Sequence, residues 1–247
     1  MLKDIVFAFQ FLTRIPLPSL QFDPARAGRS MRYYPLVGIF IGELLVLLHL
    51  FLARHLPVRI ENMILLVFMA AVTGAFHLDG FADTVDAFFS VKDRDKMLAI
   101  MKDSRVGAIG AIGLILLLLA KFELLCALPA ASKNAALFLM PVLSRWSMPV
   151  SARVMPYARA EDGLGRSFCE SVCWPDVIIA SLIAFVPAVA LLGMNGLTVI
   201  SVAGLSTGGL LLYAHRKIKG ITGDVMGFIA EILEVVILLF FVAAPYR

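Results

Sequence analysis

Long apolar runs separated by short polar segments occupy most of the chain. A helix that crosses the hydrocarbon core of a bilayer, about 30 Å thick, needs roughly 20 mainly apolar residues. Segments that meet this test cover residues 35–53, 60–78, 106–130, 134–152, 177–194, 197–214 and 225–244. The pattern predicts an all-α, polytopic integral membrane protein, a helical bundle of about seven transmembrane helices.

The composition excludes a soluble or disordered chain. Apolar residues make up 60% of the 247 residues, charged residues make up 16%, and the mean hydropathy is +0.90. In soluble domains, apolar residues make up roughly 45–50% and charged residues about 25%. No polar block is long enough to fold by itself, so we expect a single integral membrane domain over residues 1–247. The three cysteines lack the spacing of a disulfide framework or a zinc site.

The N-terminal segment differs from the seven apolar runs. Gln10 and Arg14 interrupt its apolar stretch, and Pro16 and Pro18 would end a helix there. It has no small-residue cleavage signature of a removable signal peptide. We therefore expect an interfacial or re-entrant segment at this end of the chain.

The distribution of positive charge predicts the orientation. Of the 22 Lys and Arg residues, 16 lie in the N-terminal tail and in the loops after the second, fourth and sixth spans, whereas four lie on the opposite face. Cytoplasmic loops collect Lys and Arg. We expect the N-terminus and these loops in the cytoplasm, and the C-terminus on the other side.

Three aspartates follow the second apolar run. Asp79, Asp83 and Asp86 are spaced i, i+4 and i+7, which places all three on one face of a helix. Carboxylates this close repel one another unless a cation lies between them, and hard oxygen ligands favour Mg²⁺ or Ca²⁺. The alternative is an acidic, solvated helix face.

A second acidic stripe opens the last run. Asp224, Gly227, Glu231 and Glu234 recur on one helix face, and the two glutamates lie inside an otherwise apolar span. A carboxylate there costs a few kcal/mol unless it is paired, protonated or metal-bound. A structural pair, hydrogen-bonded to a neighbouring helix, remains an alternative to a metal site.

Basic residues precede the third run. Lys102, Asp103 and Arg105 lie just before it, where a helix N-terminus attracts anions, and Gly107 and Gly110 would open the approach. A positive-inside anchor would explain the charge alone. Carboxylates and arginines at one membrane face suit an enzyme that handles a diphosphate with a divalent cation. His77 could act as its base, as a metal ligand, or only as a packing residue.

Six short motifs, in order over nearly the whole chain, together resemble one known family. They are FLTRIP (11–16), YYPLVG (33–38), HLDGFADTVD (77–86), KDSRVGAIG (102–110), PYAR with GLG (156–165) and TGD with a later G and E (222–231). This set resembles the cobalamin synthase family, also called adenosylcobinamide-GDP ribazoletransferases. The chain departs mildly at Ala87, where the family usually has glycine, which concerns only local backbone geometry.

The resemblance implies the last nucleotide-loop step of cobalamin biosynthesis. A ribose hydroxyl of α-ribazole, or of α-ribazole 5′-phosphate, attacks the cobinamide-linked phosphorus of adenosylcobinamide-GDP, and GMP leaves. It also implies Mg²⁺ as cofactor and a multi-pass protein of the cell inner membrane, in contact with the lipid bilayer and with a cytoplasmic site. We expect no nucleic-acid partner, and the oligomeric state stays open, a homo-oligomer included.

The matching motif positions receive roles by their chemistry. They are His77, Asp83 and Asp103 in catalysis, Lys102, Arg105 and Arg159 on phosphate, and Asp79, Asp83, Asp86, Asp224 and Glu231 on the metal. Three other functions account for part of the pattern. A CDP-alcohol phosphotransferase would need Ala-Arg where Asp83-Thr84 stands. A prenyltransferase would need two separated aspartate-rich motifs, which Asp79 to Asp86 and Asp224 to Glu234 approximate only loosely. An ion-coupled transporter would use Glu43, Arg145, Glu231 and Glu234 along a pathway.

Overall fold

The computed structural model describes all residues except 19, 22, 91, 104, 160–163 and 245–247. The described residues are almost entirely helical and form no strand, apart from one isolated β-bridge between Tyr157 and Ile221. The predicted all-α class is therefore confirmed.

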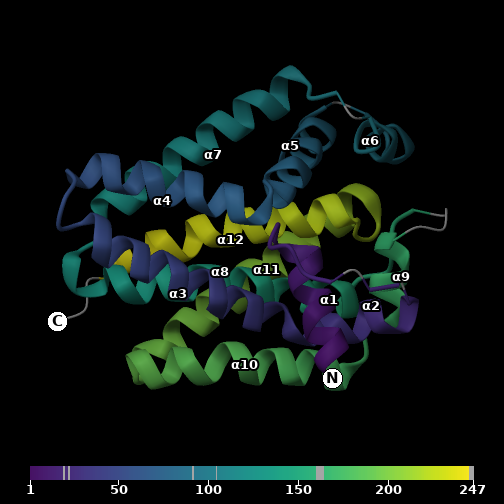
Figure 1. Cartoon of the computed structure of the whole chain (residues 1–247). Helices are drawn as coiled ribbons and strands as arrows, with labels where there is room; N and C mark the ends of the chain where they lie inside the picture. Colours follow the sequence, from purple (N-terminus) through teal and green to yellow (C-terminus); the bar gives the residue numbers. More distant parts are fainter. Residues whose placement is uncertain (19, 22, 91, 104, 160–163, 245–247) are drawn as a thin grey trace.

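Long helices run back and forth along one direction in Figure 1, and shorter ones gather at one end. The long helices are α3 (Tyr34–Leu52), α4 (Val58–Thr73), α7 (Ala108–Ala127), α8 (Ala130–Val154), α10 (Trp174–Leu192), α11 (Met194–Ile218) and α12 (Gly223–Ala243). The shorter elements are α1 (Leu2–Leu12), α2 (Pro24–Ser30), the 3-10 turn η1 (Met31–Tyr33), α5 (Phe76–Phe89), α6 (Arg94–Ile100) and α9 (Leu164–Ser171). Helix α12 ends, at Ala243, on the side of the molecule opposite α1, α2, α6 and α9 (Figure 1).

Fewer helices than the seven expected are apolar enough to cross a membrane by themselves. Among the described residues, five pass by length and composition, namely α7, α10, α11, α12 and the stretch that contains α2 and α3. A sixth is reached if α4 and α5 count as one broken span. The remaining predicted run, 134–152, is α8, which at 25 residues is about 38 Å long but carries many polar side chains.

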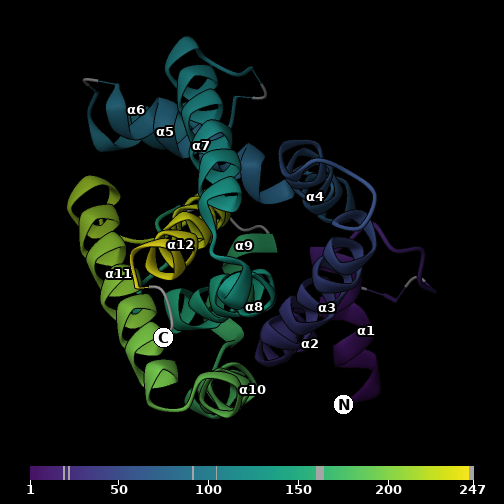
Figure 2. The same cartoon turned by 90° about the vertical axis from the view of Figure 1, so that its left-hand side faces the viewer.

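Helix α8 is polar because the other helices cover it. It packs against α3, α12, α10 and α11, and Figure 2 shows it between them. Close approach to α3 depends on glycine, because a Cβ on Gly38 would lie 2.5 Å from the carbonyl oxygen of Pro141. The helix continues through Pro141 and Pro149. Burial inside protein, not in lipid, explains why its side chains are less apolar than expected.

The second predicted span, 60–78, is broken. Helix α4 ends at Thr73, and α5 leaves it at an angle of 91° after Gly74 and Ala75, both of which have a positive φ. Arg14 lies against this bend, and its backbone N–H donates to the carbonyl of Val72. With 14 residues, α5 is about 21 Å long and too short to cross a bilayer. The bend carries the three aspartates away from the axis of α4.

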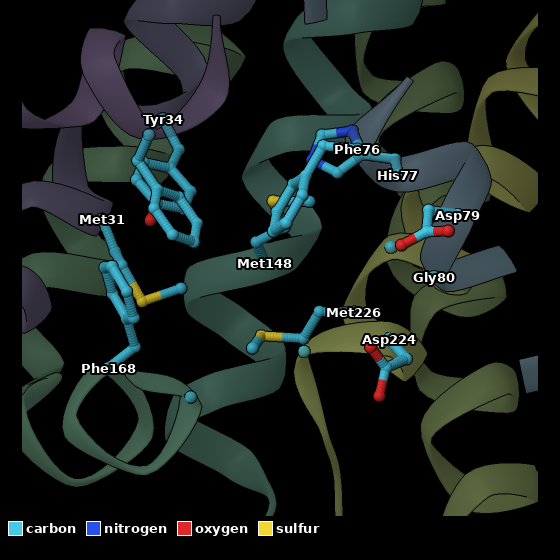
Figure 3. Close-up of a pocket in the computed structure, with 14 residues that line it drawn as sticks. Met31, Tyr34, Phe76, His77, Asp79, Gly80, Met148, Phe168, Asp224 and Met226 are labelled. Atoms are coloured by element: carbon cyan, nitrogen blue, oxygen red, sulfur yellow. The ribbon is translucent and has the colours of Figure 1, made fainter. Parts of the chain in front are cut away.

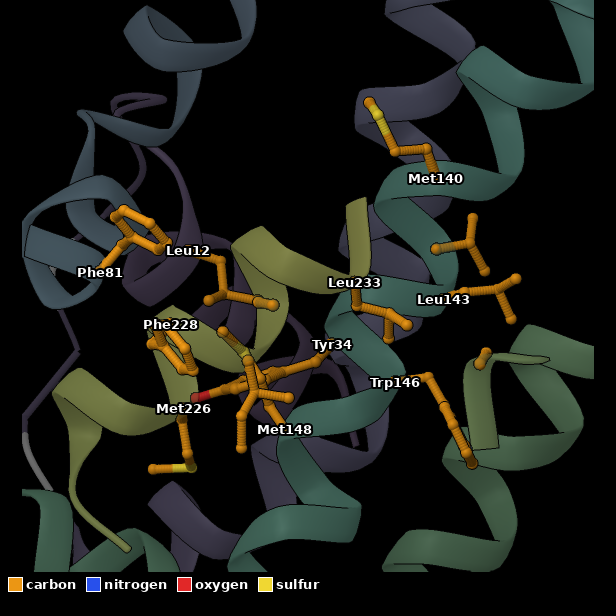
Figure 4. Close-up of a cluster of buried hydrophobic side chains, with 14 of the residues drawn as sticks. Leu12, Tyr34, Phe81, Met140, Leu143, Trp146, Met148, Met226, Phe228 and Leu233 are labelled. Carbon is orange, nitrogen blue, oxygen red and sulfur yellow. The ribbon is translucent and has the colours of Figure 1, made fainter. Parts of the chain in front are cut away.

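The apolar core lies where α8 and α12 meet the surrounding helices. Figure 4 shows Met140, Leu143 and Trp146 of α8 together with Phe228 and Leu233 of α12 in this cluster. On its far side, Phe228 stacks on Phe81 of α5 at 5.5 Å between ring centroids. The core therefore holds α5 against α12.

Four charged side chains are buried beneath the core and neutralise one another. The ammonium of Lys121 on α7 lies 2.5 Å from a carboxylate oxygen of both Glu231 and Glu234 on α12. Arg145 of α8 donates to Glu234 and to the hydroxyl of Ser144. Lys121 is only 1% exposed, so its ammonium lies inside the protein and does not reach the membrane interface. Glu231 and Glu234 are thus paired with cations of neighbouring helices, which is the structural alternative to a metal site.

Candidate functional site

Two acidic helices cross at very short range. A Cβ on Gly80 of α5 would lie 2.9 Å from the backbone of Asp224, and one on Gly227 of α12 would lie 3.2 Å from the carbonyl oxygen of His77. Any larger side chain would push the helices apart. The glycines thereby bring the HLDGFAD and TGD motifs, far apart in sequence, to one place.

Three carboxylates converge at this crossing. Asp79 and Asp224 line the same cavity. Partial burial, followed by the negative charges of Asp79, Asp224 and Asp86, raises the pKa of Asp83 to about 6. The contribution of these three neighbours to the shift marks a concentration of negative charge, which a cation would relieve.

Arg159 reaches the same crossing from the loop after α8. Its guanidinium donates to a carboxylate oxygen of Asp224 at 2.8 Å and to the carbonyl of Met101. The backbone of the loop is held by two hydrogen bonds, from Ala158 N–H to the carbonyl of Ile221 and from Ile221 N–H to that of Pro156. Of the three residues expected to bind phosphate, Arg159 is the one placed against the carboxylates.

Asp86 has a different role from the one expected. Its carboxylate oxygens accept the backbone N–H groups of Gly107 and Gly110 at 2.7 and 2.8 Å. The predicted anion site at the start of α7 therefore exists, but a carboxylate of the protein fills it. The two glycines are needed because a Cβ on either would lie within 2.4 Å of Asp86. Asp86 is left out of the metal set proposed below.

The basic motif before α7 lies at the surface. Arg105 is exposed, with a side chain 86% accessible, and its guanidinium binds both carboxylate oxygens of Asp103. This pairing lowers the pKa of Asp103 to about 2. Lys102 is also exposed, and residue 104 lies outside the described part of the chain. The loop thus presents positive charge to solvent, beside the helix whose first turn Asp86 caps.

Glu231 does not join the carboxylates at the crossing. Glu231 lies two turns further along α12 than Asp224, inside the buried charge network, where its partner is Lys121 of α7. A carboxylate already neutralised by an ammonium at 2.5 Å gains little from a metal ion. It too is left out of the metal set proposed below.

His77 lines the cavity between its polar and apolar walls. Figure 3 shows Asp79, Gly80 and Asp224 on one side, Met31, Tyr34 and Phe168 on the other, and His77 with Met148 and Met226 between them. The imidazole is 2% exposed, and neither ring nitrogen has a hydrogen-bond partner among the described residues. A bound molecule is the natural partner for a polar group that faces a cavity.

The carboxylates fit Mg²⁺ only in company with a ligand. Within the described parts of the chain, no three His, Cys, Asp or Glu side chains are grouped closely enough to hold a metal ion. Mg²⁺ in phosphate-handling sites is usually bound by one or two carboxylates, several waters and the substrate's phosphates. Asp79, Asp83 and Asp224 suit such a site, in which the substrate's phosphates complete the coordination of the metal ion.

Comparison with known proteins decides the family. The family described as cobalamin-5-phosphate synthase matches residues 4–242. The chain belongs to this family. The adenosylcobinamide-GDP ribazoletransferase of Geotalea daltonii is 38% identical to it over 100% of both chains. That of Fusobacterium nucleatum is 35% identical over 99% of this chain and 98% of the relative. One from Clostridium botulinum (strain Loch Maree) is 37% identical over 96% of each chain. No solved structure matches.

Membership of the cobalamin-5-phosphate synthase family removes the other enzyme classes. The chain lacks the CDP-alcohol phosphotransferase motif. The family match covers residues 4–242, which include both acidic motifs on which the prenyltransferase interpretation depended. The transporter interpretation depended on unpaired charges within the membrane. Glu231 and Glu234 instead pair with Lys121, and Glu234 also pairs with Arg145.

Sequence reasoning missed the apolar wall of the cavity. Phe11, Tyr34, Met148, Phe168 and Met226 come from five different helices and line it together. Phe11 and Tyr34 lie in two of the motifs that carried the resemblance, which was a usable signal. The methionines gave none, because a buried methionine reads the same whether it faces a core or a ligand.

Proposed function

We propose that the protein joins adenosylcobinamide-GDP to α-ribazole, or to α-ribazole 5′-phosphate, and releases GMP. The product is adenosylcobalamin or its 5′-phosphate, so the step completes the nucleotide loop of cobalamin. One observation carries the proposal: in a chain of the cobalamin-5-phosphate synthase family, α5 and α12 bring Asp79 and Asp224 to one cavity, with Asp83 close enough to interact with both charges. The names of the relatives supply the substrates.

The reaction is a substitution at phosphorus. A ribose hydroxyl of α-ribazole forms a new bond to the phosphorus that carries cobinamide, and the bond from this phosphorus to the bridging oxygen of the diphosphate breaks. GMP leaves with that electron pair, and the hydroxyl loses its proton. The protein must align the hydroxyl with the phosphorus and offset negative charge on the diphosphate.

Asp79, Asp83 and Asp224 would hold Mg²⁺ together with the substrate's phosphates. When bound, Mg²⁺ supplies positive charge that offsets the developing charge on the phosphate oxygens and on GMP. Asp83 lies close enough to interact with the charges of both Asp79 and Asp224, and a cation would relieve that repulsion. Mg²⁺ dependence is thus a proposal that rests on the chemistry of these side chains.

The basic side chains would bind the diphosphate. Arg159 is held against Asp224 by a hydrogen bond, so a phosphate beside Asp224 would lie within reach of its guanidinium. Arg105 and Lys102 lie on the exposed loop before α7, where they suit capture of the anionic substrate. Asp103 orients Arg105 and does not react in this scheme.

His77 is the proposed base. A neutral imidazole without a hydrogen-bond partner in the described structure can accept the hydroxyl proton directly. We place the site at the cytoplasmic face of the inner membrane, because both substrates are polar and most of the Lys and Arg residues lie in the segments on that side of the bundle.

GMP release by detergent-purified protein tests the proposal. With adenosylcobinamide-GDP, α-ribazole and Mg²⁺, the parent should release GMP, and excess EDTA should abolish release. Asp83→Asn should lose at least about a hundredfold in kcat while it keeps its elution profile, because it removes charge and a hard ligand together. Asp95→Asn is the matched control, since Asp95 is an exposed aspartate on α6 whose ion pair, in the described part of the chain, is with its neighbour Arg94.

Two outcomes would contradict the proposal. Absence of GMP release by folded parent protein would remove the activity. Full turnover in excess EDTA, or an Asp83→Asn variant as active as Asp95→Asn, would remove the metal assignment and leave the activity in place.

A further inference from the structure

The cavity continues beyond the carboxylates into an apolar chamber. Six side chains, which we call the chamber residues, line it: Phe11, Met31, Tyr34, Met148, Phe168 and Met226. Figure 3 shows Met31, Tyr34 and Phe168 on the side away from Asp79 and Asp224. The cavity therefore has a polar end, where charge is handled, and an apolar end that the reaction at phosphorus does not require.

The size and walls of the cavity suit a flat aromatic ring. Its volume is about 180 Å³, and an engineered apolar cavity of about 150 Å³ binds benzene. Aromatic rings pack well edge to face or offset against other rings, and methionine sulfur makes favourable contacts with ring edges. Phe11 and Phe168 already pack against each other, with centroids 4.6 Å apart.

We infer that the chamber binds the dimethylbenzimidazole ring of α-ribazole, an inference that rests on the proposed function. Of the ring systems in the two substrates, this one alone is small and almost wholly apolar. Besides the nitrogen bonded to ribose, it has a single ring nitrogen and two methyl groups. The corrin macrocycle is far larger than a cavity that holds one small ring.

Guanine and adenine fit the chamber poorly for a different reason. Each carries several donors and acceptors around its edge, and burial of such groups without partners costs several kcal/mol. Among the chamber residues, only Tyr34 has a polar side-chain atom other than sulfur. The walls therefore select for the base that needs the fewest hydrogen bonds.

The chamber also sets the direction in which α-ribazole would enter. A ring among the chamber residues directs its ribose toward His77 and then toward Asp79 and Asp224, because His77 lies between the two ends (Figure 3). The unpartnered imidazole then meets a ribose hydroxyl. Binding of the base would thus align the nucleophile before the diphosphate is engaged.

A pair of methionines on α8 provides a matched test. Met148, 4% exposed, is a chamber residue, whereas Met140, 1% exposed, lies two turns earlier on the same helix and lines no part of this cavity. Met148→Ala should raise the KM for α-ribazole roughly tenfold or more, because each carbon lost from an apolar pocket weakens binding by about that factor. The KM for adenosylcobinamide-GDP should stay at the parental value, and Met140→Ala should change neither KM.

Equilibrium dialysis of the parent protein gives a second measurement that needs no variant. The ligands are α-ribazole and the matching ribosides of unsubstituted benzimidazole and of adenine, each without adenosylcobinamide-GDP. We expect the Kd to rise at least tenfold on loss of the two methyl groups, and to rise further for adenine. Equal affinities for the three ribosides would overturn the inference.

The kinetic result separates the inference from the proposed function. If the parent releases GMP but Met148→Ala raises the KM for adenosylcobinamide-GDP instead, the chamber belongs to the other substrate. If Met148→Ala and Met140→Ala behave alike, the chamber residues have only a packing role. In both cases the inference fails while the activity stands, whereas a parent that releases no GMP refutes the activity itself.

Discussion

Substitution of Lys121 by methionine tests the buried charge network. The change keeps much of the side chain's length but removes the ammonium that contacts Glu231 and Glu234. Arg145 is then left with two buried carboxylates, one of which has lost its only partner among the described residues. Loss of one member of a buried ion pair costs about 3–5 kcal/mol.

The expected effect is large enough to measure by thermal unfolding in detergent. At about 2–4 °C per kcal/mol for a chain of this size, Lys121→Met should lower the Tm by roughly 6–20 °C. Lys96→Met is the control, because Lys96 is 68% exposed and pairs with Asp93 at the surface, where such a pair contributes at most about 1 kcal/mol.

The double variant Lys121→Met, Glu231→Gln isolates the role of charge. It removes one positive and one negative charge together, so it should recover a substantial part of the Tm lost in the single variant. An unchanged Tm for Lys121→Met, or a double variant less stable than the single one, would refute the view that mutual neutralisation holds these four side chains in place.

Three further predictions follow from the crossing, the cap and the charge distribution. Gly80→Val should place a Cβ 2.9 Å from the backbone of Asp224, displace α5 from α12 and lower the rate of GMP release roughly a hundredfold. Gly204→Ala, at a position with open space around it, should have no effect. Parental activity in Gly80→Val would show that the crossing does not position the site. Asp86→Ala should lower the Tm by about 1–8 °C through loss of its two cap bonds, without a change in the Mg²⁺ concentration that gives half-maximal activity, and a shift in that concentration would return Asp86 to the metal ligands. Single cysteines at positions 29 and 95, in a chain without its native cysteines, should resist labelling from the periplasmic side of intact cells, while one appended after Arg247 should react; the reverse pattern would invert the topology.

Periodicity and spacing predicted the elements because they depend on local sequence. The helical class, the shared face of Asp79 and Asp83 and the place of Asp224 at the start of the last described helix all follow from composition and from the i, i+4 rule. The break after Thr73 was not recognised, because the apolar run continues to Phe76 and only Gly74 signals an end. The burial of α8 inside the protein was not predicted either, because the composition of a moderately apolar run does not show whether lipid or other helices surround it.

Partner choice could not be read from the sequence. Lys121 and Glu231 are 110 residues apart, and nothing local indicates that they meet. The same holds for Asp86, whose spacing from Asp79 and Asp83 suggests a shared role, although its oxygens bind the start of α7. Tertiary contacts decide whether a carboxylate serves a ligand, a lysine or a helix end.

The charge network also constrains the order in which the protein can be assembled in the membrane. Lys133 of α8 finds its carboxylate on Glu61 of α4, which is synthesised first. Lys121 and Arg145 must wait for Glu231 and Glu234, which lie on α12 and are synthesised after both α7 and α8. Until then, Lys121 and Arg145 lack the carboxylates that neutralise them in the described structure. Insertion of α12 is thus the step that neutralises both cations, and a chain that stopped before α12 would leave them in an apolar environment at a cost of several kcal/mol.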